Sequence, residues 1–515
     1  MALITILALP VALLIWTAQT LAYNRDKAKA TGLPYLERWI SPINPFWLLY
    51  GSSFVRLCER LGIATENLSR IYSYGWEANQ RAKIHEDYGD AFLVVHPGGL
   101  QLCVSNAEII YDILRRRTDF RRNMEEMAVL NVYGKNLSTT DDQEWQQHRK
   151  MTSVTFTEKN NELVWQQSLL QAEGMLKYWT ERASQPIRST GQDTKVLTLN
   201  VLAAALFNKV YPFEGQAEEV PYGKPHDDSY EYRSSLSTIL GSIIQIFIFG
   251  EQGLTAWWVP KSWQAAASAM STFRSYIFGL MEEERRYIAE GKENNQHLVA
   301  RLVNACEEDQ VEGNLNNDST EKGDLSRKMT LTREEILSNL FVYAFAGNDT
   351  TSIALTNILI HLAANPKTQD WIAEEINHYF NESDVGIWNY NTYSKLKRCS
   401  AVVVGTGTLE AESLLPDTSD NFMPFAWGQR VCPGKKFAQV ELVAVLARLF
   451  GKWTVVPDPE NGETLEQARN RAWKSSLIVD HQGHMLHEMV NPESVALKWV
   501  ERETREKHTL DTSTS

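Results

Sequence analysis

The sequence has few cysteines, and none of them forms a recognisable pair. The five cysteines, Cys58, Cys103, Cys306, Cys399 and Cys432, stand singly along the chain, with no C-x-x-C spacing. This pattern excludes a small disulfide-stabilised scaffold and argues against a zinc ribbon. It suits a protein that resides in a reducing compartment.

The chain also lacks an excess of basic residues. It carries 51 Lys and Arg against 64 Asp and Glu, which gives a formal net charge of −13. A general nucleic-acid binder needs a basic surface to neutralise phosphates, so we expect no nucleic-acid partner. With 515 residues, of which 43% are hydrophobic, the chain can bury a large core, and its expected partners are small molecules, proteins and a membrane.

No charged residue occurs between Met1 and Asn24. As a helix, residues 2–23 would extend about 33 Å, enough to cross a hydrocarbon core of about 30 Å. We predict a transmembrane signal anchor over residues 1–24 and a basic, proline-punctuated hinge over residues 25–50. A cleaved signal peptide is the alternative, but no basic region precedes the apolar run. The basic residues after the anchor predict a single pass with the downstream chain in the cytosol.

One cysteine lies in a short loop rich in Gly and Pro. The run Phe-Ala-Trp-Gly-Gln-Arg-Val-Cys-Pro-Gly contains Phe425, Gly428, Arg430, Cys432 and Gly434, and an apolar helical stretch follows it. Glycines let the backbone approach a flat macrocycle, and a helix N-terminus behind the sulfur favours the thiolate, so Cys432 is a candidate haem-iron ligand. A phosphate-binding loop is excluded because the Gly and Lys spacing is wrong. The run resembles the F-x-x-G-x-R-x-C-x-G signature of the cytochrome P450 family.

Two further motifs match this family in the same order along the chain. Trp145 and Arg149 are four residues apart, so on a helix they share a face, as in the family's W-x-x-x-R motif. The resemblance implies that this pair binds a haem propionate, with His148 as a possible added donor. An ordinary amphipathic helix is the alternative interpretation.

The third motif lies in a long apolar helix predicted from Arg333 to about Ala364, which a capping box of Thr332 and Glu335 begins. Its middle reads Ala-Gly-Asn-Asp-Thr-Thr and resembles A-G-x-[DE]-T-[TS]. Polar groups interrupt a buried helix here, and Gly347 allows the helix to open beside them. The resemblance implies that Thr350 donates a hydrogen bond to bound dioxygen and that Asp349 feeds protons through water. A helix bend stabilised by threonine hydroxyls is the alternative.

The predicted fold is mostly α-helical with small β-sheets, a cytochrome P450-like fold, plus one N-terminal transmembrane helix. Residues 92–104 read as two β-runs around a Pro-Gly-Gly turn, followed by a helical pattern over residues 106–116. We assign residues 51–500 to the haem domain and residues 501–515 to a polar tail.

One element of the family is missing. No E-x-x-R occurs between Thr351 and Cys432, because the chain passes from residues 404–409 almost directly to Phe425. We therefore infer an internal deletion near residues 400–412 that removes the family's K-helix motif and the meander before the cysteine loop. A skipped stretch of coding sequence and a truly shortened protein both explain the join.

The resemblance implies a membrane-bound monooxygenase of the endoplasmic reticulum that contains haem b and oxidises a lipophilic small molecule. The sequence is similar to fungal members that tailor terpenoids or polyketides in secondary metabolism. No nicotinamide or flavin fingerprint is present, so electrons are expected from NADPH through a separate cytochrome P450 reductase. Its expected docking patch is Lys435, Lys436, Arg149 and Lys150, and the expected substrate-facing positions are Met127, Val129, Leu130 and Val132.

Two alternatives from other classes stay open. The first is a catalytically inactive, membrane-anchored relic of the family that cannot hold haem, because the missing segment leaves buried charges and sheet edges uncompensated. The second is an unrelated helical scaffold tethered to a membrane.

Overall fold

The computed structural model describes residues 2–73, 75–153, 156–182, 185–215, 228–292, 297–304, 331–380, 388–402, 423–480 and 486–502. The deletion is predicted near residues 400–412, and most of these residues lie outside the described ranges. The same holds for nearly all of the predicted tail at 501–515.

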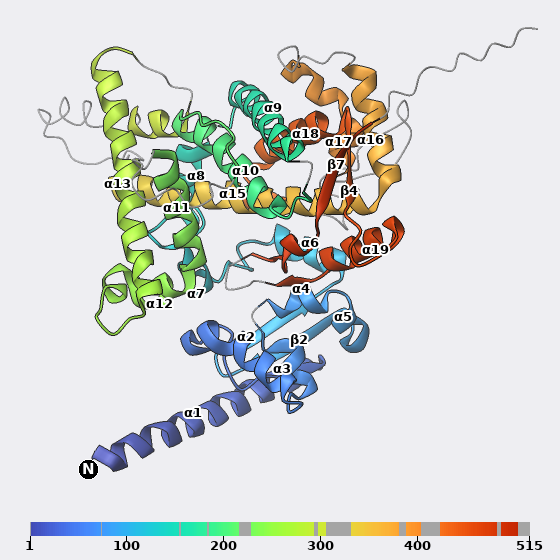
Figure 1. Ribbon diagram of the computed structural model, residues 1–515. Coiled ribbons are helices and arrows are strands. Elements are labelled where there is room, and N and C mark those ends of the chain that lie inside the picture. Colours follow the sequence, from blue (N-terminus) through green and yellow to red (C-terminus); the bar gives the residue numbers. More distant parts are fainter. Residues whose placement is uncertain are drawn as a thin grey trace, which may run out of the picture.

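The described chain is mostly helical with three small sheets, as predicted (Figure 1). Its α-helices are α1 Ala2–Thr31, α2 Pro45–Arg60, α3 Glu66–Ile71, α4 Trp76–Gln80, α5 Lys83–Tyr88, α6 Ala107–Arg115, α7 Met124–Met127, α8 Asp142–Ser153, α9 Glu158–Glu181, α10 Thr190–Phe207, α11 Asp228–Gly241, α12 Ile243–Leu254, α13 Lys261–Ala289, α15 Arg333–Ala364, α16 Pro366–Tyr379, α17 Lys397–Ala401, α18 Lys435–Phe450 and α19 Leu465–Ser476.

The largest sheet has three strands, in the order β1 (Tyr35–Glu37), β2 (Ala91–His96) and β3 (Gly99–Val104). β2 and β3 form the predicted hairpin, with His96 opposite Gly99. Alternate residues of β2 face opposite sides, so Phe92 packs with Trp76, whereas Val95 packs with Leu21 and Ala28 of α1. The two small sheets pair β4 (Trp453–Pro457) with β7 (Leu497–Glu501) and β5 (Val479–Asp480) with β6 (Glu488–Met489).

Helix α1 extends away from the rest of the chain at its N-terminal end, and its last turns pack on the sheet (Figure 1). Asn24 Nδ2 donates to the His96 carbonyl at 2.9 Å, and Arg25 Nε pairs with Glu37 Oε1 at 2.6 Å. The segment predicted as a hinge therefore contains the end of α1, β1 and the start of α2. Among the described residues no single helix meets the length and hydropathy needed to cross a membrane. One pair, Glu231–Gly241 and Ile243–Leu254, meets them together, but it is bent by 103°.

The main core is built around α15, which runs through the centre of the helical part (Figure 1). The helix has the predicted bounds and the predicted capping box. The Glu335 amide donates to Thr332 Oγ1 at 3.2 Å, and the Thr332 amide donates to Glu335 Oε2 at 2.8 Å. Helices α9, α10, α13 and α18 supply many of the other apolar side chains in this core.

Two buried glutamates in the core differ in their surroundings. Glu375 on α16 accepts hydrogen bonds from the amides of Arg398 (2.7 Å) and Cys399 (3.0 Å). Glu441 on α18 is equally buried, but neither of its carboxylate oxygens has a hydrogen-bond partner in the described chain. Burial raises the pKa of Glu441 well above its ordinary value, so this side chain is a neutral acid in the folded protein.

Replacing Glu441 with Met should stabilise the protein. The change removes a buried carboxyl group that has no hydrogen-bond partner in the described chain. We expect the free energy of unfolding to rise by about 1–3 kcal/mol. The gain should be larger at pH 7.5 than at pH 4.5, because only the unfolded state of the native chain releases the Glu441 proton as the pH rises. Urea unfolding at the two pH values measures both effects.

The matched control is Glu375→Met, which should destabilise the fold because it leaves two buried amides unpaired. A loss of stability in Glu441→Met that equals the loss in Glu375→Met would contradict this account of Glu441.

Candidate functional site

The loop that carries Cys432 is closed by backbone hydrogen bonds. The Cys432 amide donates to the Phe425 carbonyl at 2.9 Å, and the Val431 amide donates to the Gly428 carbonyl at 3.1 Å. Gly428 has a φ of 78°, a left-handed conformation that favours glycine. Gly434 is the N-cap of α18, so the cysteine immediately precedes the N-terminus of a helix, as predicted.

The Cys432 thiol is exposed, whereas Cys58 and Cys399 are buried. Partial desolvation by its neighbours raises the pKa of Cys432, while the Gly434 amide and the charge of Arg149 act in the opposite direction. Arg149 lies on α8 and Gly434 at the start of α18. Two of the sequence motifs therefore contribute to the electrostatic environment of one sulfur atom.

Arg430 joins the cysteine loop to α8. Its guanidinium lies 4.6 Å from the centre of the buried Trp145 ring, and its Nη2 donates to Asp141 Oδ1 at 2.5 Å. Burial acts to raise the pKa of Asp141, but the Asp142 amide and Arg430 outweigh it and hold this pKa below its ordinary value. In the described chain, Arg430 Nη1 is buried and has no hydrogen-bond partner. The contact between the cysteine loop and α8 therefore contains a positively charged N–H group, Arg430 Nη1, that could donate to a bound anion.

The sequence did not indicate Asp141 as the partner of Arg430. It precedes α8 directly, and the two residues are 289 positions apart in sequence. Nor did it indicate Arg117, whose guanidinium lies 5.9 Å from the Trp145 ring, on the same indole as Arg430. The clustering of basic residues around 115–122 is the only signal that would have pointed to this region.

On α15 the polar motif lies within a continuous helix, so the expected opening at Gly347 is absent from this structure. Gly347 instead allows close packing on α10, because an added Cβ would lie 2.7 Å from Leu202 Cδ2. Thr350 Oγ1 donates back to the Ala346 carbonyl at 2.5 Å, and both side chains are exposed. The neighbouring Asp349 is half-buried. Ala346 and Thr350 are thus exposed on a helix whose other residues are mostly buried, so this face of α15 is accessible to a ligand.

The predicted substrate-facing and reductase-docking residues differ in how exposed they are. Leu130 and Val132 are buried in the main core and Val129 packs against it, so Met127 and Val129 are the more accessible substrate-facing candidates. Of the predicted docking residues, Lys150 is exposed, whereas Lys436 Nζ lies 4.1 Å from the centre of the Tyr393 ring.

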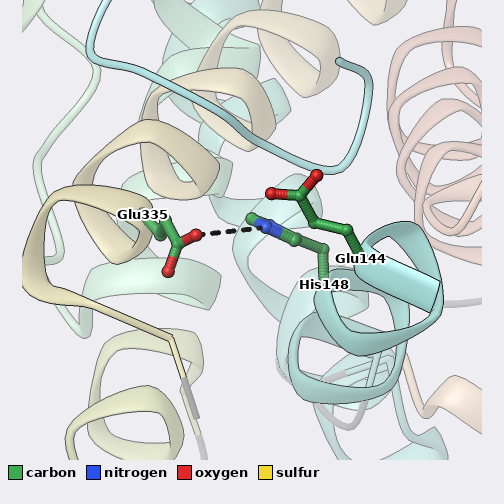
Figure 2. A group of neighbouring side chains, drawn as sticks. All are labelled: Glu144, His148 and Glu335. Atoms are coloured by element: carbon green, nitrogen blue, oxygen red, sulfur yellow. Dashed lines mark ion pairs between the residues drawn. The ribbon is translucent and has the colours of Figure 1, made fainter. Parts of the chain in front are cut away.

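His148 lies away from the cysteine loop. Figure 2 shows its imidazole between the carboxylates of Glu144 on α8 and Glu335 on α15, with Nε2 3.8 Å from Glu335 Oε1. One ligand atom from each of the three residues lies within 4.8 Å of the others. The expected donation from His148 to a propionate therefore has no support in this geometry.

Close to the position of the predicted deletion, α17 is hydrogen-bonded to α16. Besides the two amides that bind Glu375, Arg398 Nη1 donates to Glu374 Oε2 and to the Trp371 carbonyl, at 2.7 and 2.8 Å. The five-residue α17 therefore has a buried anchor, although the chain contains no E-x-x-R between Thr351 and Cys432.

Comparison with known proteins identifies the family. The cytochrome P450 family model matches residues 71–403 and 410–480. The chain thus belongs to the cytochrome P450 family and is a cytochrome P450 monooxygenase, an oxidoreductase. Members of this family use haem, a small-molecule substrate and a redox partner that supplies electrons.

Curated relatives include fungal monooxygenases. A cytochrome P450 monooxygenase of Arthrobotrys oligospora is 26% identical over 543 residues, covering 87% of this chain and 90% of the relative. One from Penicillium roqueforti is 27% identical over 379 residues, covering 70% and 61%. The phomenoic acid biosynthesis cluster cytochrome P450 monooxygenase of Leptosphaeria maculans is 22% identical over 575 residues, covering 89% and 94%.

The comparisons also concern the position of the predicted deletion. The family match is interrupted at residues 404–409, where the sequence predicts it. The alignments with the Arthrobotrys and Leptosphaeria proteins span 543 and 575 positions, more than the 515 residues of this chain, so they contain gaps.

Proposed function

We propose that this chain is a haem-thiolate monooxygenase in which Cys432 is the axial ligand of haem b. The observation that carries the proposal is the junction of Cys432, Arg430 and Trp145. It combines an exposed thiol ahead of a helix N-terminus with a buried guanidinium nitrogen that has no hydrogen-bond partner among the described residues. A thiolate ligand and a propionate acceptor would satisfy these two groups together.

The side chains present fit this cofactor. Arg430, Trp145 and Arg149 would hold propionates, and Phe425, Gly428 and Gly434 shape the loop around the sulfur. When bound, thiolate-ligated haem supplies the activation of dioxygen and the insertion of one oxygen atom into a C–H bond. Arg149 adds positive charge beside the sulfur and favours its anionic form.

Asp349 and Thr350 would hold and transfer protons for the bound cofactor. The Thr350 hydroxyl is exposed and donates its proton to the Ala346 carbonyl, so it would rotate away from that carbonyl to donate to a bound ligand. Gly347 and Leu202 pack α15 closely on α10, which holds this segment in place. Asp349 is half-buried one residue away, and its carboxyl group is the nearest acid in sequence that can replenish a proton.

The electron donor in this proposal is NADPH, through a separate cytochrome P450 reductase. A docking surface for an acidic flavoprotein would use the exposed Lys150 together with Lys435 at the start of α18.

The proposed substrate is a lipophilic small molecule of fungal secondary metabolism, a terpenoid or a polyketide. Support comes from the printed name of the Leptosphaeria relative, which places that protein in a phomenoic acid biosynthesis cluster.

We also propose that the chain is a single-pass protein of the endoplasmic reticulum membrane, anchored by residues 1–24 with the catalytic domain in the cytosol. Large apolar side chains are exposed on α1 and on the neighbouring α2 region, among them Trp16, Phe46 and Leu61. Trp257, which is 91% exposed, follows α12, and α12 contacts α2. Exposed apolar side chains of this kind suit contact with a bilayer surface.

Deleting residues 2–20 should convert the protein from an integral to a peripheral membrane protein. The deletion leaves Leu21 and Ala28, which pack on the sheet, in place. Full-length protein should resist extraction from microsomes with alkaline carbonate, whereas the shortened protein should be released by carbonate yet sediment with membranes in buffer. Release of the full-length chain by carbonate would contradict the anchor.

Replacing Thr350 with Ala should uncouple NADPH consumption from product formation. Without the hydroxyl proton donor, we expect the ratio of product to NADPH to fall by about tenfold or more, with hydrogen peroxide in its place. The assay uses the membrane protein with a reductase and ¹⁸O₂, and it measures label in the product. Thr350→Ser keeps the hydroxyl and should stay coupled; an unchanged ratio in Thr350→Ala would refute the assignment.

A further inference from the structure

Polar side chains connect α8 and α15 at three levels. The pairs are Glu144 with Glu335, His148 with Asn339, and Thr152 with Tyr343. Successive members are four residues apart on both helices, about one helical turn, so the two helices run in the same direction along this contact. We call these six residues the α8–α15 ladder, and Figure 2 shows part of it.

The middle level determines which ring nitrogen of His148 accepts a hydrogen bond. The Leu137 amide donates to Asn339 Oδ1 at 2.9 Å, which leaves the Asn339 amide nitrogen as the donor. This nitrogen donates to the Glu335 carbonyl at 2.7 Å and lies 2.8 Å from His148 Nδ1. Nδ1 must therefore accept, and the proton of the neutral imidazole lies on Nε2.

The upper level places this proton between two acids. His148 is 1% exposed, and among the described residues Nε2 has no hydrogen-bond partner. Glu335 Oε2 is engaged in the helix cap, which leaves Oε1 to face the imidazole, and Glu144 also pairs with Lys135 at 2.8 Å. A metal ion would need the Nε2 lone pair and a proton on Nδ1, which faces a donor. The hydrogen bond at Nδ1 therefore argues against a metal site, and the Nε2 proton faces Glu335 Oε1 at 3.8 Å, beyond hydrogen-bond distance.

The lower level is a direct hydrogen bond in the core. The Tyr343 hydroxyl donates to Thr152 Oγ1 at 2.8 Å, and Thr152 Oγ1 donates to the His148 carbonyl at 2.7 Å. Both side chains are buried, so this level excludes rotation of either helix without the loss of a buried hydrogen bond.

The ladder connects two helices that each carry a residue of the proposed haem site. Arg149 lies between the two lower levels on α8 and acts on Cys432. On α15, Thr350 follows Tyr343 by two helical turns and so continues the same face. We propose that His148 and Asn339 are positioning residues: they set the rotation of α8 against α15, so that Arg149 reaches the haem and Thr350 borders the same space. This inference rests on the haem-binding role of Arg149 proposed above.

A double-mutant cycle on haem affinity tests the inference. Apo-protein is titrated with haem for the native chain, His148→Phe, Arg149→Ala and the double variant, and urea unfolding of each apo-protein is measured alongside. Each single change should weaken haem binding by about tenfold, and the double variant should bind no more weakly than Arg149→Ala alone. His148→Asn, whose Oδ1 replaces the acceptor at Nδ1, should retain most of the affinity.

The results of this cycle distinguish the proposed haem-binding role of Arg149 from the positioning role of His148 and Asn339. Effects that multiply in the double variant would show a merely structural role and would overturn the positioning inference. An Arg149→Ala variant with native haem affinity would overturn the proposed role of Arg149, and the inference with it. Nitrogen-15 histidine spectra of the apo-protein should show His148 protonated at Nε2 and unchanged by ZnCl₂; loss of that proton on zinc addition would refute the exclusion of a metal.

Discussion

The packing of Arg430 on Trp145 is the interaction on which the proposed site depends. It joins the cysteine loop, near the C-terminal end of the chain, to a helix that precedes the main core helices. The guanidinium covers the indole and pairs with Asp141, and one of its nitrogens is buried with no hydrogen-bond partner in the part of the chain that the structure describes. Burying such a donor costs free energy, typically about 1–3 kcal/mol, and a bound anion would recover that cost. The pair therefore both assembles the site and prepares it for an acidic group of the cofactor.

Local patterns in the sequence predicted much of the fold and the local structure around the candidate site. The capping box of Thr332 and Glu335, the hairpin from Ala91 to Val104 and the loop before α18 depend on short-range spacing, and the structure has all three. Each can be recognised because its geometry is decided within a few residues.

Contacts that depend on helix rotation could not be predicted in the same way. His148 is next to Arg149 in sequence, yet it turns to α15, because Asn339 offers it a hydrogen bond that no local pattern reveals. Gly347 is part of a motif, but its visible task is to admit Leu202 from another helix. Periodicity defines the buried face of a helix, whereas the partner on that face is set by tertiary packing.

The absence of an E-x-x-R motif between Thr351 and Cys432 sets the main constraint on function. Helix α17 has a buried anchor at Glu375 and Arg398, and the family match stops two residues beyond its end. On the neighbouring α18, Glu441 is buried and has no hydrogen-bond partner within the described ranges. The loop, α8 and α15 nevertheless retain their mutual contacts, which do not pass through residues 403–422. The relic interpretation requires that these contacts are insufficient to retain haem.

The most direct test is the carbon-monoxide difference spectrum of the dithionite-reduced, full-length protein beside its Cys432→Ala variant. Our account predicts the strongly red-shifted Soret band of thiolate-ligated haem in the native chain and its disappearance in the variant. A folded, monodisperse native protein without that band would contradict the account and would identify this chain as a member of the family that has lost its cofactor.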